Sequence, residues 1–357
     1  MQTIPVNTNP AYAVTIGPGL LKKCGQMLRS AVPPCRAAVI TDSIVGPLYL
    51  ETVTESLKAA GYAAAAFAFP AGEGSKNLST LSDILEFLAK ERLTRTDCLI
   101  ALGGGVVGDM AGFAAACYLR GIRCVQLPTT LLSAVDSSVG GKTAIDLKAG
   151  KNLAGAFLQP AAVLCDTDCL RTLPPEVFAG GAAEAVKTGV LCDESLFALF
   201  EGGTLEADPA EVIARCVAYK AGVVERDEKE QGERKLLNLG HTVGHAIEKC
   251  SGYAIPHGHA VAAGLAIMAR ASARLGWMSP EGLRQNDAER ICSTLRLTGL
   301  PVSTEYAPEA LAEAALADKK RSGDAITIVV PKEIGHCELM NIPVSELLFV
   351  IGTGWEA

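Results

Sequence analysis

The first half of the chain alternates short apolar runs with segments of helical pattern. Each run has the length of a strand and ends in turn-forming or polar residues, as buried parallel strands do. The predicted strands are residues 11–16, 37–42, 63–69, 98–102 and 124–130, and the predicted helices are residues 47–60, 78–90 and 110–118. In the second of these helices Leu78, Leu81, Leu85 and Leu88 are expected to share one face. This alternation predicts a doubly wound, mostly parallel sheet, which binds ligands at the carboxyl ends of its strands.

One predicted strand, Cys98–Leu102, runs directly into Gly103-Gly104-Gly105-Val106-Val107-Gly108-Asp109. A strand, glycines and then a helix of small residues allow a backbone to approach a phosphate at a helix N-terminus. The spacing is not G-x-G-x-x-G, and a tight strand-to-helix turn explains the glycines equally well. The N-terminal half is therefore predicted to be Rossmann-like, with a candidate phosphate site at this turn.

The pattern changes after about residue 165. Helices are predicted over residues 176–192, 208–225, 233–250, 259–275 and 281–295, whereas residues 325–330 and 336–340 look extended. We predict an α/β domain over residues 1–168 and a mainly α-helical domain over residues 169–357. A chain of 357 residues is long enough for two such cores.

Charge and cysteine content exclude several classes of protein. The net charge of −7 argues against a nucleic-acid or anionic-membrane surface, so an anionic substrate needs a local cluster of cations. The 12 cysteines form no C-x-x-C pair, and we expect reduced, buried thiols. The N-terminus lacks a basic region followed by an apolar one, and no stretch is long enough to span a bilayer. A cytoplasmic location is the expectation.

Four of the five histidines lie close together in the sequence, at positions 241, 245, 257 and 259. His241 and His245 are four residues apart and share one face of a helix. Glu184 lies upstream in a run of small residues. Two histidines and a carboxylate with a fourth position open form a ligand set of catalytic zinc. Surface or helix-capping roles explain the histidine pair as well, and spacing does not decide which histidines would bind.

Several cations and amides lie beside glycine turns or next to the histidine helix. Taken singly, each is more often a solvated surface side chain. Together they suit a substrate that carries both phosphate and carboxylate. They are Lys142, Lys151, Asn152, Lys187, Lys220, Arg234, Asn238 and Lys319.

These motifs occur in the order found in a known family. The matching segments are residues 103–109, 128–133, 135–143, 150–153, 181–187, 238–248 and 318–320. Through them the chain closely resembles the 3-dehydroquinate synthase family, one of the sugar phosphate cyclases. The resemblance implies a lyase of the shikimate pathway, which leads to chorismate and the aromatic amino acids. Its reaction would convert 3-deoxy-D-arabino-heptulosonate 7-phosphate into 3-dehydroquinate and phosphate by transient oxidation with NAD, β-elimination, re-reduction, ring opening and aldol closure.

The resemblance also implies site residues. Zinc or cobalt would be held by Glu184, His241 and His257. NAD would contact Asp42, Glu73, Lys76, Gly104, Gly105, Asp109, Thr129, Thr130, Lys142, Lys151 and Thr172. The substrate would meet Asp136, Lys142, Asn152, Lys187, Lys220, Arg234, Asn238, His245 and Lys319. Arg120 would reach the phosphate in the neighbouring subunit of a homodimer.

One position departs from the family pattern. The family commonly has His-Gly-Glu where this chain has His257-Gly258-His259, and the additional imidazole either competes for the metal or is tolerated beside the site. Three alternatives remain. The first is another sugar phosphate cyclase, acting on glucose 6-phosphate or a seven-carbon ketose phosphate. The second is a metal-dependent alcohol dehydrogenase, which would accumulate NADH. The third is a non-catalytic zinc or nucleotide-binding module, against which stands the open metal position.

Overall fold

The computed structural model describes residues 1–202, 208–316, 321–322 and 324–356. It divides into two compact units. The first unit contains residues 1–173 and 220–229, and the second contains residues 174–219 and 230–357. The predicted Lys319 lies outside the described residues.

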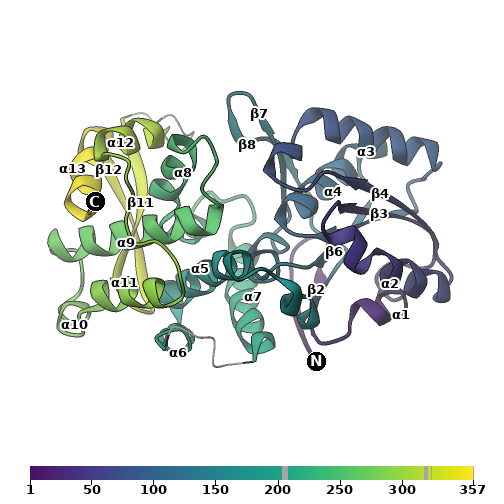
Figure 1. Cartoon of the computed structure of the whole chain (residues 1–357), viewed down its shortest axis with the longest axis horizontal. Helices are drawn as coiled ribbons and strands as arrows, with labels where there is room; N and C mark the ends of the chain where they lie inside the picture. The colour runs from purple at the N-terminus through teal and green to yellow at the C-terminus, as the bar shows by residue number, and fades with distance from the viewer. Residues whose placement is uncertain (203–207, 317–320, 323, 357) are drawn as a thin grey trace. The chain divides into compact units, whose positions relative to one another are not determined.

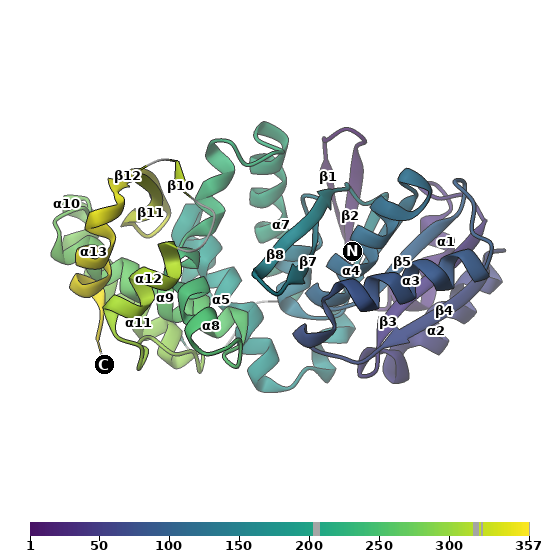
Figure 2. The same cartoon turned by 90° about the horizontal axis from the view of Figure 1, so that it is seen from above.

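The first unit is built on a seven-stranded sheet in which all neighbouring pairs except β1–β2 are parallel. The strand order is β1 (Gln2–Val6), β2 (Tyr12–Gly17), β9 (Ala162–Asp166), β6 (Arg123–Pro128), β5 (Cys98–Gly103), β3 (Arg36–Asp42) and β4 (Ala63–Phe69). The prediction of a mostly parallel sheet is confirmed. Strand β1 was not predicted because it contains Pro5, which is tolerated on an edge strand such as this one (Figure 2).

Helices cover both faces of this sheet (Figure 1). On one face α1 (Cys24–Leu28) and α2 (Val45–Ala59) share a core with Ala37 and Val39 of β3. On the other face α3 (Leu78–Lys90) and α4 (Gly105–Cys117) share a core with Ala38 and Ile40. Successive residues of one strand thus enter opposite cores, as the pleat requires. Of the four leucines predicted to share one face of α3, Leu81 and Leu88 are buried together with Ile84, whereas Leu78 is 61% exposed.

The side of the sheet on which successive strands are added changes between β3 and β5. β3 is followed by its neighbour β4 on one side, whereas β5 is followed by β6 on the other side. The carboxyl ends of β3 and β5 therefore form a topological switch point, where doubly wound sheets bind ligands. Asp42 ends β3, and the glycine turn follows β5.

A two-stranded hairpin, β7 (Lys142–Leu147) and β8 (Gly150–Phe157), packs on α4. The sequence predicted no strand over these residues. A Cβ atom on Gly112 of α4 would lie 2.3 Å from Cγ2 of Thr143. Glycine in the helix therefore makes room for the hairpin.

The second unit is mainly helical. Its core joins α8, α9, α12 and α13 to β11 of a three-stranded antiparallel sheet. The helices are α5 (Pro175–Cys192), α6 (Glu194–Ala198), α7 (Pro209–Arg226), α8 (His241–Cys250), α9 (His257–Arg274), α10 (Pro280–Arg284), α11 (Asp287–Leu297), α12 (Pro308–Leu316) and α13 (Leu347–Gly354), and the last residues of α7 belong to the first unit. The strands are β10 (Arg321–Ser322), β11 (Ala325–Glu333) and β12 (His336–Pro343).

Short helical turns connect these elements. They are η1 (Leu21–Lys23), η2 (Glu73–Ser75), η3 (Tyr118–Arg120), η4 (Ser133–Ser137), η5 (Thr167–Thr172), η6 (Glu233–Asn238) and η7 (Val344–Glu346). Two predicted helices are in fact divided. The first breaks between η6 and α8 at Gly240, which has φ +76°, and the second breaks between α10 and α11 at Asn286, which has φ +56°. Both residue types tolerate the left-handed conformation that ends a helix.

The 12 cysteines are free thiols, but Cys117 is exposed, so the prediction of burial is wrong there. Within the described ranges, no helix is both long enough and apolar enough to cross a bilayer.

Candidate active site

The glycine turn at the end of β5 starts helix α4 at Gly105, five residues before the predicted start. A Cβ atom on Gly104 would lie 3.1 Å from Cγ2 of Thr130, and one on Gly105 would lie 3.2 Å from Oγ of Ser137. Glycine therefore lets the turn pack closely against the segment that follows β6. The first amides of a helix have no partner within the helix and favour an anion, so this turn has the local structure of a phosphate site.

Lys76 ties this helix to the β7–β8 hairpin. Its buried Nζ lies 2.6 Å from Oδ2 of Asp109 on α4 and donates to Oδ1 of Asn152 at 2.5 Å. Asn152 has φ +55°, and its amide donates to Asp146, whose own amide donates to the carbonyl of Lys76. Burial raises the pKa of Asp109, yet the pKa of Lys76 is also raised, because the nearby carboxylates Asp109 and Glu73 outweigh the burial that lowers it. The proton therefore stays on the lysine, and the pair is charged.

A second lysine pair lies in the first unit. Nζ of Lys220 donates to Oδ1 of Asp136 at 2.5 Å and to its carbonyl at 2.7 Å. Lys151 pairs with Glu73 at 3.3 Å, while Lys142 lies exposed at the start of β7. The structure thus pairs most of the predicted cations of this unit with carboxylates.

The other predicted nucleotide contacts follow the carboxyl ends of parallel strands. Oδ1 of Asp42 accepts from the amides of Ile44 and Val45, at the start of α2, at 2.9 and 2.8 Å. Thr129 is buried, and its hydroxyl has no hydrogen-bond partner among the residues described, whereas Thr130 bonds to Ser133. Thr172, after β9, shares a 2.5 Å hydrogen bond with the hydroxyl of Tyr49. Asp42, Gly104, Gly105, Thr129 and Thr130 therefore share one edge of the sheet.

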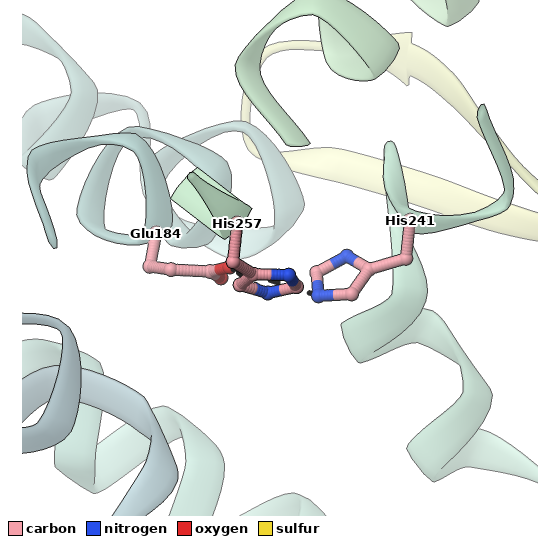
Figure 3. Close-up of side chains that lie close together, drawn as sticks. All are labelled: Glu184, His241 and His257. Atoms are coloured by element: carbon pink, nitrogen blue, oxygen red, sulfur yellow. Dashed lines mark ion pairs between the residues drawn. The ribbon is translucent and has the colours of Figure 1, made fainter. Parts of the chain in front are cut away.

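In the second unit, Glu184, His241 and His257 come together from three helices (Figure 3). Glu184 lies in the middle of α5, and each histidine is the first residue of its helix, α8 or α9. Oε1 of Glu184 lies 3.6 Å from Nε2 of His241 and 3.4 Å from Nε2 of His257. One ligand atom from each residue lies within 4.8 Å of the other two.

Glycine contacts between helices make this approach possible. A Cβ atom on Gly258 would lie 2.1 Å from the carbonyl oxygen of Gly180, so α9 meets α5 at backbone distance. A Cβ atom on Gly264 would lie 2.2 Å from the carbonyl oxygen of Gly240, which brings α9 to the start of α8. The helices that carry the three groups therefore meet at positions where side chains are excluded.

Neighbouring acceptors orient both histidines. Nδ1 of His241 lies 3.0 Å from the carbonyl oxygen of Leu239, and Nδ1 of His257 lies 3.0 Å from Oε2 of Glu248. With the Nδ1 proton held by these acceptors, Nε2 is the nitrogen of each ring that would offer its lone pair to a metal, and it faces Glu184. Burial lowers the pKa of His241, and Lys187 lowers it further. Burial also opposes the charge on His257, but Glu184 and Glu248 raise its pKa to about 10.

Glu184 is 1% exposed and charged. Burial disfavours its charge, but Lys187, with Nζ 2.5 Å from Oε2, and the two histidines hold the pKa of the carboxyl well below its usual range. Lys187 also donates to the carbonyl of Leu237 at 2.9 Å. Neither carboxylate oxygen accepts a hydrogen bond of normal geometry from any described residue. A buried carboxylate facing two imidazole nitrogens in this way fits a divalent metal with an open fourth position.

His245 and His259 occupy different surroundings. The ring of His245 lies with its centroid 5.4 Å from that of His241 and 5.8 Å from that of His257. His259 lies beside Gly180 and takes part in neither group of potential metal ligands found among the described residues. Burial lowers the pKa of His259, opposed by Glu176. The departure from the family pattern therefore leaves the ligand cluster itself intact.

The remaining predicted residues are placed as follows. Arg234 is fully buried on η6, and Nδ2 of Asn238 donates to Oε1 of Glu230 at 2.7 Å. Arg120 is exposed and, like Leu119, lies in the left-handed region, with φ +68° and +50°. Such strain in non-glycine residues is found at functional sites.

Three carboxylates that contact predicted site residues, Asp146, Glu230 and Glu248, were not singled out from the sequence. Glu230 lies in an acidic run that resembles a solvated surface. Glu248 was detectable, because it lies seven residues after His241 and so on the same face of the helix.

Comparison with known families finds a match over most of the chain. The model of the 3-dehydroquinate synthase N-terminal domain matches residues 66–180, and that of the C-terminal domain matches residues 181–321. The chain belongs to the 3-dehydroquinate synthase family. A 3-dehydroquinate synthase of Neisseria meningitidis serogroup A is 45% identical over 98% of both chains.

Two solved structures share the fold of this family member. One is 2-deoxy-scyllo-inosose synthase complexed with carbaglucose-6-phosphate, NAD⁺ and Co²⁺, with a TM-score of 0.85, 25% identity and coverage of 98% of this chain and 99% of that one. The other is the 2-epi-5-epi-valiolone synthase of Streptomyces hygroscopicus subsp. jinggangensis with NAD⁺ and Zn²⁺ bound, with a TM-score of 0.86, 25% identity and coverage of 96% of each chain.

Proposed function

We propose that this protein is a 3-dehydroquinate synthase, which converts 3-deoxy-D-arabino-heptulosonate 7-phosphate into 3-dehydroquinate and phosphate. The observation that carries the proposal is the convergence of Glu184, His241 and His257 in a chain 43–45% identical, over nearly its whole length, to relatives of that name. The ligand set leaves room for a substrate oxygen, as catalytic rather than structural metal sites do.

Glu184, His241 and His257 would hold a divalent metal, zinc or cobalt, in line with the ions bound to the solved relatives. When bound, NAD supplies a reversible hydride acceptor, and the metal supplies a Lewis acid for the oxygen of the alcohol that is oxidised. The charge of Lys187 beside Glu184 offsets the negative charge that burial disfavours, so the carboxylate is ready to bind a cation.

The first unit would hold the nucleotide at the switch point of its sheet. The amides of Gly104 and Gly105 would face its phosphates, and the hydroxyls of Thr129 and Thr130 would add hydrogen bonds. Asp42, at the end of β3, would bind a ribose hydroxyl. The other residues assigned to the nucleotide are Glu73, Lys76, Asp109, Lys142, Lys151 and Thr172.

Charged and amide side chains would bind the substrate, and the cations among them would neutralise the leaving phosphate. The residues are Asp136, Lys142, Asn152, Lys187, Lys220, Arg234, Asn238, His245 and Lys319. After oxidation of the alcohol at C5, a phosphate oxygen takes the proton from C6 as the bond between C7 and the phosphate breaks, and the cations stabilise the departing phosphate. Lys220 with Asp136, and His245, are the groups we assign to proton transfer in ring opening and aldol closure. The protein contributes mainly positioning and charge.

The strained, exposed Arg120 fits a role at a subunit interface. We propose a homodimer in which Arg120 reaches the phosphate site of the second copy. Co-expression of Arg120→Ala chains with His241→Ala chains tests this. In the mixed dimer the site of the Arg120→Ala chain keeps its own His241 and receives Arg120 from the second copy, so activity above that of either variant alone is expected. Activity no higher than that of the single variants would argue against the proposed arrangement. A cytoplasmic location stays a prediction.

The proposed reaction is tested by phosphate release from 3-deoxy-D-arabino-heptulosonate 7-phosphate with NAD, with and without a chelator, while NADH absorbance is followed. Chelator-sensitive release without lasting NADH supports the proposal. Lasting NADH indicates the alcohol dehydrogenase, and release from glucose 6-phosphate in place of the heptulosonate indicates another cyclase.

A further inference from the structure

Glu248 is a buried carboxylate in the last turn of α8 whose place in the helix is unfavourable. Its side chain is 2% exposed, so its charge is costly to bury without partners. It also lies near the negative end of the helix dipole, where a cation is preferred. Local helix stability therefore does not account for a carboxylate here.

Its contact with His257 leads to the ligand cluster. Oε2 of Glu248 lies 3.0 Å from Nδ1 of His257, on the side of the ring opposite to Nε2, which faces Glu184. Spacing explains how this occurs: His241 and Glu248 are seven residues apart on α8, so the helix face that presents one ligand also presents the partner of another.

We propose that Glu248 is a positioning residue that fixes the tautomer and ring orientation of His257 for metal binding. An ionised carboxylate only accepts hydrogen bonds, so it holds the proton on Nδ1 and leaves the lone pair on Nε2. His257 depends on this contact more than His241 does. Its side chain is 33% exposed, against 10% for His241, which is held by the main-chain carbonyl of Leu239 two residues before it. Carboxylates that orient metal-binding histidines also raise the basicity of the ligand.

A competing arrangement is that Glu248 binds the metal itself. Ligand atoms of His245, Glu248 and His257 also lie within 4.8 Å of one another. In that arrangement Nδ1 of His257 would face the ion and Glu184 would be left out. We favour the positioning role because it accounts for the buried Glu184, with its two oxygens lacking hydrogen bonds of normal geometry from described residues.

The test measures binding of Zn²⁺ and Co²⁺ to the full-length chain by competition with a chromophoric chelator. The variants are Glu248→Ala, which removes the acceptor, and Glu248→Gln, which keeps a neutral acceptor of the same size. The matched control is Glu338→Gln. Glu338 faces His336 at 3.5 Å in an exposed pair of the same unit.

We expect Glu248→Ala to weaken metal affinity by about 10- to 100-fold and Glu248→Gln by less, about three- to tenfold, with Glu338→Gln within twofold of the unchanged protein. The visible spectrum of bound Co²⁺ should keep its position and intensity in both Glu248 variants, because the ligand set is unchanged. Metal affinity within twofold in both Glu248 variants overturns the proposal. A spectrum that indicates loss of a ligand also overturns it, since Glu248 would then bind the metal. If Glu248→Ala does not fold, the Glu248→Gln result decides.

This inference rests on the proposed function for the presence of a catalytic metal, but its readout needs no turnover. Metal binding weakened at Glu248 in a protein that forms no 3-dehydroquinate refutes the proposed function alone. Unchanged metal binding in Glu248 variants of an active enzyme refutes the positioning role alone.

Discussion

Replacing Gly258 with alanine is expected to disturb the metal site without touching a ligand. The new Cβ atom would lie 2.1 Å from the carbonyl oxygen of Gly180 and 2.6 Å from its carbonyl carbon and Cα. An ordinary contact begins at 3.4 Å, so α9 must move away from α5 by about 1.3 Å. Because the opposing atoms are backbone, no change of rotamer relieves the overlap.

The expected cost follows from this displacement. Overpacking of this kind costs about 1–3 kcal/mol, and the gain in helix propensity from glycine to alanine offsets up to about 1 kcal/mol. His257 is the neighbouring residue, and metal–ligand distances tolerate only about 0.2 Å. We therefore expect a loss of about 1–2 kcal/mol in the free energy of unfolding and a fall of at least about tenfold in metal affinity, equivalent to about 1.4 kcal/mol.

The assay is urea unfolding together with zinc competition. Gly352→Ala in α13 is the matched control, since its Cβ atom would meet one atom at 3.9 Å within the same unit. That variant should be as stable as the unchanged protein or slightly more stable, with unchanged metal affinity. A Gly258→Ala protein that unfolds at the same urea concentration as the unchanged protein and binds zinc equally tightly would show that the close contact of Gly258 with Gly180 does not position the metal site.

Three further predictions follow from single contacts. Lys76→Met leaves the carboxylate of Asp109 without its ammonium partner. NAD titration should then show weaker binding, and urea unfolding should show a loss of about 2–4 kcal/mol in the free energy of unfolding, which adding Asp109→Asn partly restores. An unchanged NAD affinity would contradict this prediction. Burial raises the pKa of Asp193, but its hydrogen bonds and Arg215 on α7 keep that pKa below its usual range, so its contribution to stability is present above the unfolded pKa and is lost as pH falls through the folded one. Asp193→Asn should therefore cost about 1 kcal/mol at pH 7 and progressively less as the pH falls through the folded pKa, and a cost independent of pH argues against it. His241→Ala should abolish chelator-sensitive phosphate release while the far-UV circular dichroism stays native, whereas His336→Ala, at an exposed position, should keep full activity; activity in the first variant rules out the ligand assignment.

The sequence predicted the parts of the fold in which local pattern and tertiary role agree. Runs such as Cys98–Leu102 are buried on both faces and therefore apolar throughout, which made the central strands recognisable. The hairpin β7–β8 escaped prediction because its strands are only partly buried and β8 contains two glycines, Gly150 and Gly155. Helix 233–250 was predicted as one element, since its apolar pattern continues across Gly240, and only the left-handed φ of that residue ends the pattern.

The candidate site was harder than the fold to predict from local sequence patterns. Spacing placed His241 and His245 on one face, but the residues that the structure brings to Glu184 are His241 and His257, each at the first position of a different helix. That choice depends on the contacts of Gly258 and Gly264 between helices, which no local pattern specifies. The resemblance to the family, not the spacing, predicted this set of three residues.

The most direct test of the account uses 3-deoxy-D-arabino-heptulosonate 7-phosphate that carries deuterium on C5, incubated with the protein, metal and NAD. In the proposed mechanism the hydride leaves C5 and returns to it within one active site. The expected result is therefore a carbocyclic 3-dehydroquinate that retains the deuterium, one phosphate per product and no net NADH. Phosphate release without a carbocyclic product, or a product whose deuterium has been lost to free NAD, would contradict it.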